Sequence, residues 1–238
     1  MAFQISLASN TSKIVREYQE GILLEDPYEV GLKHFVSWNN VYNITKKNNC
    51  FVLIEDRGGL EQGFHEIFIP EGLYEVDDLF AELNKNPKMT ASSTKLSLDK
   101  NKLKIKISTK WSIDFTGNKS MGNVLGFSKR ITPKGRTVYS DFPINIFNIN
   151  TVKINCNLVH TNIQDYKRNV NTLYDFPFDS SKIGGPLIKE PNPICYFPVT
   201  VDRIYELVIT ITDQDNNLID FRGESINLTL DFRPLHGY

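Results

Sequence analysis

Cysteine is scarce in this chain of 238 residues, and its three copies, Cys50, Cys156 and Cys195, lie far apart. No CxxC pair occurs, so neither a zinc knuckle nor a disulfide framework is indicated. Isolated thiols in odd number are typical of a protein that is made in a reducing compartment inside a cell.

Long apolar runs and an excess of charge of one sign are also missing. The 27 basic and 28 acidic residues give a formal net charge of -1, which provides no electrostatic reason to bind nucleic acid or an anionic membrane. The first residues, MAFQISLASN, lack the basic start and apolar run of a secretory signal. We therefore expect no specific nucleic-acid partner, no membrane association and no secretion.

Recognisable catalytic motifs are absent as well. The four histidines, His34, His65, His160 and His236, show no metal-ligand spacing. The sequence contains no GxSxG elbow, Walker A loop, HExxH or GxGxxG. We expect no enzyme activity, no catalytic residue, no cofactor and no structural metal.

One segment near the C-terminus has part of a calcium-loop pattern. Asp213, Asp215, Asn217 and Glu224 occupy the first, third, fifth and twelfth places of an EF-hand loop. However, the flanking residues alternate with the period of strands, and Leu218 stands where the loop needs glycine. The stretch is better interpreted as the polar bend of a β-hairpin, with a cation near Asp213–Asn217 left open.

What the sequence has in quantity is period-two alternation of apolar and polar residues, the pattern of β-strands. The stretch YEVGLKHFVSW places Val30, Leu32 and Phe35 in apolar positions, with one irregularity that a β-bulge explains. TKLSLDKNKLKIKIST predicts a hairpin, and its exposed lysines indicate solvation and protection against edge pairing rather than nucleic-acid binding. Further β-rich stretches occur at 50–56, 63–70, 143–160, 207–212 and 226–232.

Two short stretches have helical patterns. In the first, apolar residues recur at i, i+3, i+4 and i+7, namely at Val76, Leu79, Phe80 and Leu83. The second is GNKSMGNVLGF, where Met121, Val124 and Leu125 predict a short helical turn.

Together these patterns predict an all-β fold, a single jelly-roll β-sandwich with one or two short helices in the connections. We expect residues 1–27 to form an N-terminal arm and residues 28–238 to form the jelly-roll domain. Residues 161–193 are predicted to be a long irregular loop. Its aromatic stretch LYDFPF (173–178) is either a contact patch for other copies or a cover for the end of the chain's own sandwich.

Several stretches resemble the penton-like minor capsid proteins of Maverick/Polinton-type elements, whose relatives are adintoviruses and virophages. They are KINCNLVH, NVLGF, IFIPEGLYEVDDLFAELN and above all RIYELVITITDQDNNLIDFRGESINLTLDFRP. The resemblance covers most of residues 28–234 as a pattern of hydrophobic order and turns, and segment 161–193 departs from it. The resemblance transfers no functional site residue to this chain, because no such residue defines the family.

The resemblance implies a single jelly roll of which five copies close the fivefold vertex of an icosahedral shell. The implied partners are sister copies in a homopentamer and a double-jelly-roll major capsid protein. The implied location is the capsid vertex of a virion, after synthesis inside the host cell. The N-terminal arm and the tail RPLHGY are candidate tethers that would order on assembly.

Two other function classes stay open at this point. A carbohydrate- or ligand-binding β-sandwich module would need a planar aromatic platform, for which Tyr166, Tyr174 and Trp38 are candidates. A cupin-type enzyme would need a cluster of histidines and carboxylates, and the scattered histidines argue against it.

Overall fold

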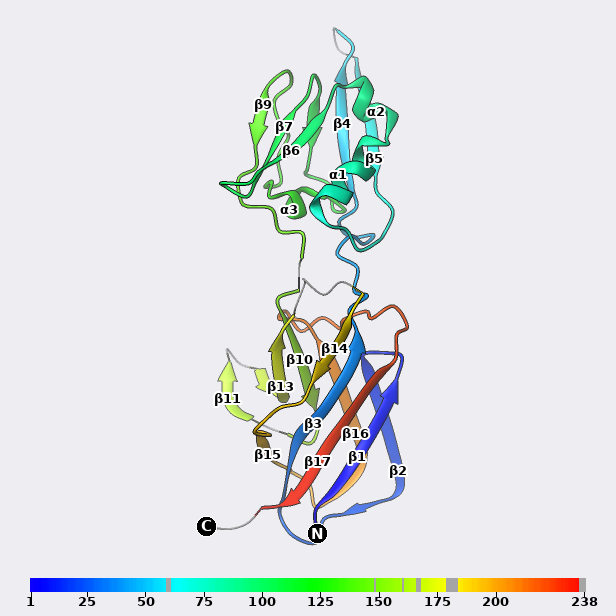
Figure 1. The fold of residues 1–238 in the computed structure, drawn as a ribbon, viewed down its shortest axis with the longest axis vertical. Helices are drawn as coiled ribbons and strands as arrows, with labels where there is room; N and C mark the ends of the chain where they lie inside the picture. The colour runs from blue at the N-terminus through cyan, green and yellow to red at the C-terminus, as the bar shows by residue number, and fades with distance from the viewer. Residues whose placement is uncertain (59–60, 148, 160, 166–167, 179–183, 236–238) are drawn as a thin grey trace. The chain divides into compact units, whose positions relative to one another are not determined.

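The computed structural model of the chain describes residues 1–58, 61–147, 149–159, 161–165, 168–178 and 184–235. The fold divides into two compact units. The first, which we call the sandwich, contains residues 1–41 and 149–238; the second, the inserted unit, contains residues 42–148. Antiparallel sheets dominate both units (Figure 1), which confirms the expected all-β class.

The sandwich consists of two sheets built from eight main strands. In chain order the first strand pairs with the last, the second with the seventh, the third with the sixth and the fourth with the fifth, all antiparallel. This nested pairing produces the sheet orders β1-β17-β3-β14 and β13-β10-β16-β2, the wrapping of a jelly roll. The eight strands are β1 (Phe3–Ser9), β2 (Lys13–Leu23), β3 (Tyr28–Trp38), β10 (Thr151–Cys156), β13 (Thr172–Pro177), β14 (Pro186–Lys189), β16 (Arg203–Thr212) and β17 (Ile226–Pro234).

Period-two alternation places the apolar side chains of both sheets in one shared core. Val30, Leu32 and Phe35 of β3 are fully or almost fully buried. The predicted bulge is confirmed, because Thr229 pairs with His34 while Leu230 pairs with Leu32, so Lys33 is the extra residue. It returns Phe35 to the inner face, where its ring lies 5.7 Å from that of Phe176 in the opposite sheet.

The predicted N-terminal arm is wrong, because residues 3–23 form two strands of the sandwich. β1 pairs with β17 along its whole length, from Phe3 opposite Phe232 to Ser9 opposite Ile226. Phe3 also stacks on Phe232, with ring centroids 4.8 Å apart. The alternation of β2 is obscured in the sequence, since a register shift interrupts its pairing with β16 and Gly21 takes a positive φ.

The predicted irregular loop over 161–193 is also corrected. Four strands fall in this range, so the described part of it is mostly regular backbone. A hairpin of β11 (Thr161–Asp165) and β12 (Arg168–Val170) precedes β13 and β14. After β14 the short strand β15 (Tyr196–Pro198) pairs with the beginning of β3, so β14 and β15 share one edge of that sheet.

The inserted unit interrupts the jelly roll between β3 and β10, and the single domain expected over 28–238 is corrected accordingly. It contains two three-stranded sheets, β5-β4-β8 and β6-β7-β9, around a core of its own. Their strands show the same alternation of apolar and polar residues as the strands of the sandwich. Amino-acid composition therefore does not mark the boundary between the two units. They are β4 (Cys50–Asp56), β5 (Gln62–Phe68), β6 (Lys95–Asp99), β7 (Lys104–Ser108), β8 (Ser112–Asp114) and β9 (Thr137–Tyr139).

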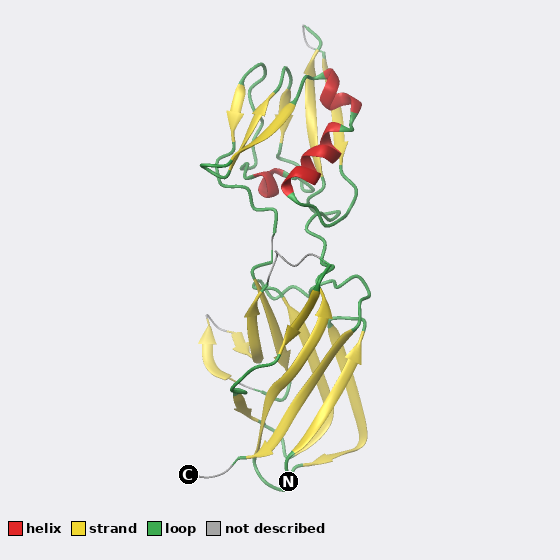
Figure 2. Cartoon of the chain, viewed as in Figure 1, coloured by secondary structure: helices red, strands yellow, loops and turns green. Residues whose placement is uncertain are grey.

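All helices of the described residues lie in the inserted unit (Figure 2), and both helical predictions are confirmed. Helix α1 (Val76–Asn84) buries Leu79 and Leu83 in the core. Helix α2 (Pro87–Ala91) starts at Asn86, whose side chain accepts a hydrogen bond from the backbone N–H of Lys88. Helix α3 (Gly122–Leu125) ends at Gly126 in the left-handed conformation, where a Cβ would lie 2.3 Å from the carbonyl oxygen of Phe142.

Candidate interaction surfaces

The two described histidines and the three cysteines do not converge on a reactive site. His34 lies 3.5 Å from Glu190 in the sandwich, while His65 contacts Glu55 at 2.9 Å in the inserted unit. His160 and His236 lie outside the described residues. Within the described ranges no group of three or more His, Cys, Asp and Glu side chains is placed to hold a metal ion.

The cysteines are free thiols. Burial raises the pKa of the Cys156 thiol to about 11, so this side chain stays protonated and unreactive at neutral pH. Burial also raises the pKa of Cys50, with Glu66 adding to the effect. Cys195 is exposed.

The segment with the calcium-loop pattern is a self-closed turn. One carboxylate oxygen of Asp213 accepts hydrogen bonds from the backbone N–H groups of Asp215 and Asn217, at 2.8 and 2.9 Å. Asn216 takes a left-handed φ of 64°. Glu224 instead accepts a hydrogen bond from Asn40 at 2.6 Å. The Asp213 carboxylate thus closes its own turn, which is the role that the hairpin interpretation gives it.

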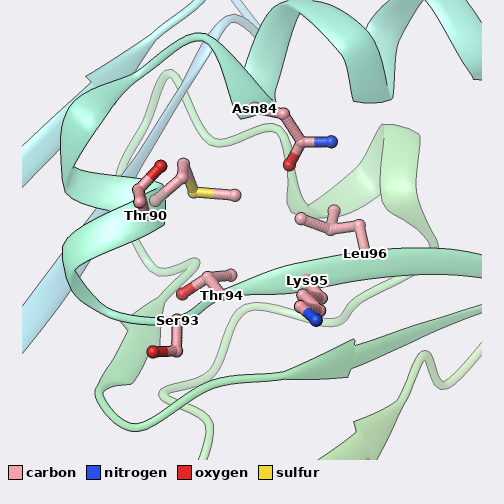
Figure 3. Close-up of a pocket in the computed structure, with 7 residues that line it drawn as sticks. Asn84, Thr90, Ser93, Thr94, Lys95 and Leu96 are labelled. Atoms are coloured by element: carbon pink, nitrogen blue, oxygen red, sulfur yellow. The ribbon is translucent and has the colours of Figure 1, made fainter.

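A hollow in the inserted unit lies between α1, α2 and β6, with a volume of about 500 Å³. Figure 3 shows its walls, with Asn84 and Leu96 on either side and Thr90, Ser93 and Thr94 along the rest. Its lining includes neither histidine, cysteine nor a carboxylate. The hydroxyl groups of Thr90, Ser93 and Thr94 and the ammonium of Lys95 therefore line the hollow without a histidine or a carboxylate that would activate them as nucleophiles.

The outer face of the β1-β17-β3 sheet carries a connected set of polar side chains. Asp231 accepts hydrogen bonds from Gln4 at 2.8 Å and from the Tyr196 hydroxyl at 2.7 Å. Arg233 lies over the Tyr196 ring at 3.6 Å and pairs with Glu29. These contacts hold β15 against the sheet.

Replacing Tyr196 by Phe tests this network. Burial and the hydrogen bond to Asp231 raise the pKa of the Tyr196 hydroxyl, so the folded sandwich holds this proton more tightly than the unfolded chain does. The free energy of unfolding should therefore fall as pH rises above about 10, the ordinary pKa of tyrosine.

Tyr196→Phe should lose about 1 kcal/mol at pH 7, because one hydrogen bond to a carboxylate disappears. The difference in stability between the two proteins should shrink as pH rises above about 10. Urea unfolding at each pH measures it, and a difference that stays constant over this range would contradict the assignment.

The aromatic stretch LYDFPF does not form an exposed contact patch. All of it but Phe178 lies in β13, where Leu173 and Phe176 are buried, and Tyr174 and Phe178 pack against the sandwich core. The alternative interpretation is therefore the correct one, since these aromatics cover the chain's own sandwich.

The aromatic platform expected of a carbohydrate-binding module is not formed by the described candidates. Trp38 is 44% exposed, whereas Tyr174 packs against the core. Tyr166 lies outside the described residues. One exposed ring of the three candidates does not make a planar platform.

No protein-family model matches the sequence, and a comparison with curated proteins finds no match. Among solved structures, the fold matches the crystal structure of the mavirus penton protein. The alignment has a TM-score of 0.51 and covers 99% of this chain and 100% of that one, at 13% sequence identity. The chain shares the fold of a penton protein. Because the alignment covers nearly all of both chains, the likeness extends to the inserted unit as well as to the jelly roll.

The penton-like resemblance seen in the sequence is therefore confirmed at the level of the fold. Its strongest stretch, RIYELVITITDQDNNLIDFRGESINLTLDFRP, includes β16 and β17, which contribute one central strand to each sheet of the sandwich. In the described part of the chain no helix is long and apolar enough to cross a bilayer.

Proposed function

We propose that this chain is a penton-type minor capsid protein, five copies of which close the fivefold vertex of an icosahedral shell beside a double-jelly-roll major capsid protein. The observation that carries the proposal is the alignment of the whole chain, both units included, with the mavirus penton protein. A ring of this kind uses one surface patch against a different patch of the next copy, and the rotation between copies closes it.

The geometry of the chain supports this role over a chemical one. The polar side chains on the outer face of the first sheet are bonded to each other, and the Asp213 carboxylate is bonded to its own turn. Several large apolar side chains among the described residues, in contrast, stay exposed. They include Phe64 and Phe142, each 63% exposed, and Tyr205, which is 58% exposed. Exposed aromatic side chains of this kind are favoured at protein interfaces.

Native mass spectrometry of the purified chain tests the proposal. We expect a species of five copies of the 27.3 kDa chain, present alone or induced by the major capsid protein. A chain that stays monomeric in both conditions and binds glycans saturably on an array would favour the carbohydrate-binding alternative.

A further inference from the structure

Two outer faces of the inserted unit differ in charge. The first, here called the acidic face, belongs to the β5-β4-β8 sheet. Its cross-strand rows pair Phe64 with Ile54 and Ser112, Glu66 with Val52 and Asp114, and Phe68 with Cys50. The opposite side of the same sheet is buried, with Ile67, Leu53 and Ile113 fully covered.

The acidic face combines exposed rings with carboxylates. Phe64 and Phe68 are 63% and 51% exposed, and Glu66 lies between them on the same strand. Beside this row runs a groove of about 410 Å³, which Val52, Phe68, Glu66 and Asp114 line together with Lys119. Apolar surface next to a carboxylate lowers the local dielectric and strengthens pairing with a cation.

The second face, here called the lysine face, belongs to the β6-β7-β9 sheet, whose inner side packs on the same core. Lys106 pairs across the sheet with Ser97 on one side and Tyr139 on the other. Lys104 pairs with Asp99, and the Lys102 ammonium lies 5.8 Å from the centroid of the Tyr139 ring. These lysines belong to the predicted hairpin, whose exposed lysines the sequence pattern assigns to solvation.

The two faces are complementary in chemistry. Lys106 is exposed, whereas the Lys104 ammonium donates a hydrogen bond to the carbonyl oxygen of Asp141 at 2.9 Å, so Lys106 is the one of these two lysines that is placed to meet a carboxylate of another copy. A lysine offers an apolar stem to a ring and an ammonium to a carboxylate. Tyr139, which is 45% exposed, adds apolar area beside Lys106, with which it pairs across the sheet.

We propose that the acidic face of one copy binds the lysine face of the next copy. This contact joins two different patches of the same unit, the heterologous arrangement that generates a ring. It rests on the proposed function, because a ring of copies is what brings the two faces together. Glu66 and Lys106 are assigned as its central charge pair.

The test uses the full chain and charge reversals at that pair: Glu66→Lys, Lys106→Glu and the double variant. Sedimentation velocity over a concentration series gives the dissociation constant between copies. Each single reversal should raise it about tenfold, because like charges then face each other. The double variant restores opposite charges and should return to within about threefold of the wild-type value.

Lys100→Glu is the matched control. Lys100 is an exposed residue of the β6–β7 turn and undergoes the same change of charge outside the face. It should leave association unchanged. The three positions of charge change, Glu66, Lys106 and Lys100, all carry exposed side chains, so the thermal unfolding of each variant should match that of the wild type.

Each result separates the inference from the proposed function. If the single reversals keep the wild-type dissociation constant and the chain still forms five-membered species, the inference falls while the proposed function stands. If the wild type does not associate on its own, the inference falls, and if it also forms no five-membered species with the major capsid protein, the proposed function falls as well. Single reversals that weaken association without rescue in the double variant would also overturn the pairing. The pairing would also be overturned if association stayed unchanged while a nucleic-acid column at low salt retained Lys106→Glu less than the wild type. That result would assign the lysine face to nucleic acid.

Discussion

Removal of residues 1–23 is expected to prevent the sandwich from folding. These residues form β1 and β2, one edge strand of each sheet, and they bury Leu7 and Ile14 in the core. Phe3, Ile5 and Ile22 pack against the same core. Two buried and three partly buried apolar side chains, at up to ~1.5–3 kcal/mol each, are comparable to the entire net stability of a domain, ~5–15 kcal/mol.

The two tryptophans make this expectation measurable, because Trp38 lies in the sandwich and Trp111 in the inserted unit. In a Trp111→Phe background, the truncated chain should show no cooperative urea transition in the Trp38 fluorescence. A chain without Met1 and Ala2, which keeps both strands, should show the normal transition. If the truncated chain kept a transition of wild-type midpoint, residues 1–23 would be an arm after all.

A point substitution in the same two strands refines the result. Leu7→Ala should lower the free energy of unfolding by about 2–4 kcal/mol, as expected for a buried leucine. Ser6→Ala, one residue earlier and on the outward face, should change it by less than about 1 kcal/mol, since its hydrogen bond to Thr229 is exposed. Equal effects would mean that β1 does not pack as described.

Phe35→Ala is expected to be the most damaging single truncation in the sandwich core, with a loss of about 3–5 kcal/mol. The Phe35 side chain is fully buried, and its ring meets Phe176 of the opposite sheet at 5.7 Å. Removing it leaves a cavity between the sheets, which the well-packed surroundings fill only in part. It also removes a ring pair that the bulge at Lys33 brings into position.

Urea unfolding followed by Trp38 fluorescence in the Trp111→Phe background gives the free energy directly. Val36→Ala is the neighbouring control, since Val36 is half-buried on the other face of β3 and should lose about 1 kcal/mol. Trp111 fluorescence in a Trp38→Phe background should be unaffected by Phe35→Ala, because the inserted unit has its own core. A loss below 1 kcal/mol would place Phe35 outside the core.

The local structure was predictable wherever burial follows a simple period. The stripe Val76, Leu79, Phe80 and Leu83 forms α1, and the alternation of 226–232 forms β17 with its even residues buried. The bulge in β3 was also predictable, because an apolar pattern that slips by one position needs an extra residue.

The division into two units was not predictable, since strand pairing is nonlocal. β1 is matched to β17 more than 200 residues later, and no local pattern encodes that partner. Residues 42–148 carry the same alternation as the sandwich that they interrupt. For β1 a signal did exist, because Phe3, Ile5 and Leu7 alternate with Gln4, Ser6 and Ala8. For β2 the sequence holds no such signal, because the register shift in its pairing with β16 interrupts the alternation.

The candidate surfaces were predicted less well than the fold. The sequence draws attention to aromatic residues, but it does not tell an exposed ring from one that covers the core. Phe176 of LYDFPF is buried, while Phe64 and Phe68 are exposed in a strand whose other face is fully covered. Which face of a strand points to solvent depends on the sheet behind it.

The most direct test of the account is electron cryomicroscopy of particles formed when the chain is co-expressed with its double-jelly-roll major capsid partner. We expect density at the fivefold vertices into which the jelly-roll sandwich fits, one copy per fifth of the ring. Closed particles with empty vertices, and the chain left as monomer in the unassembled fraction, would contradict it.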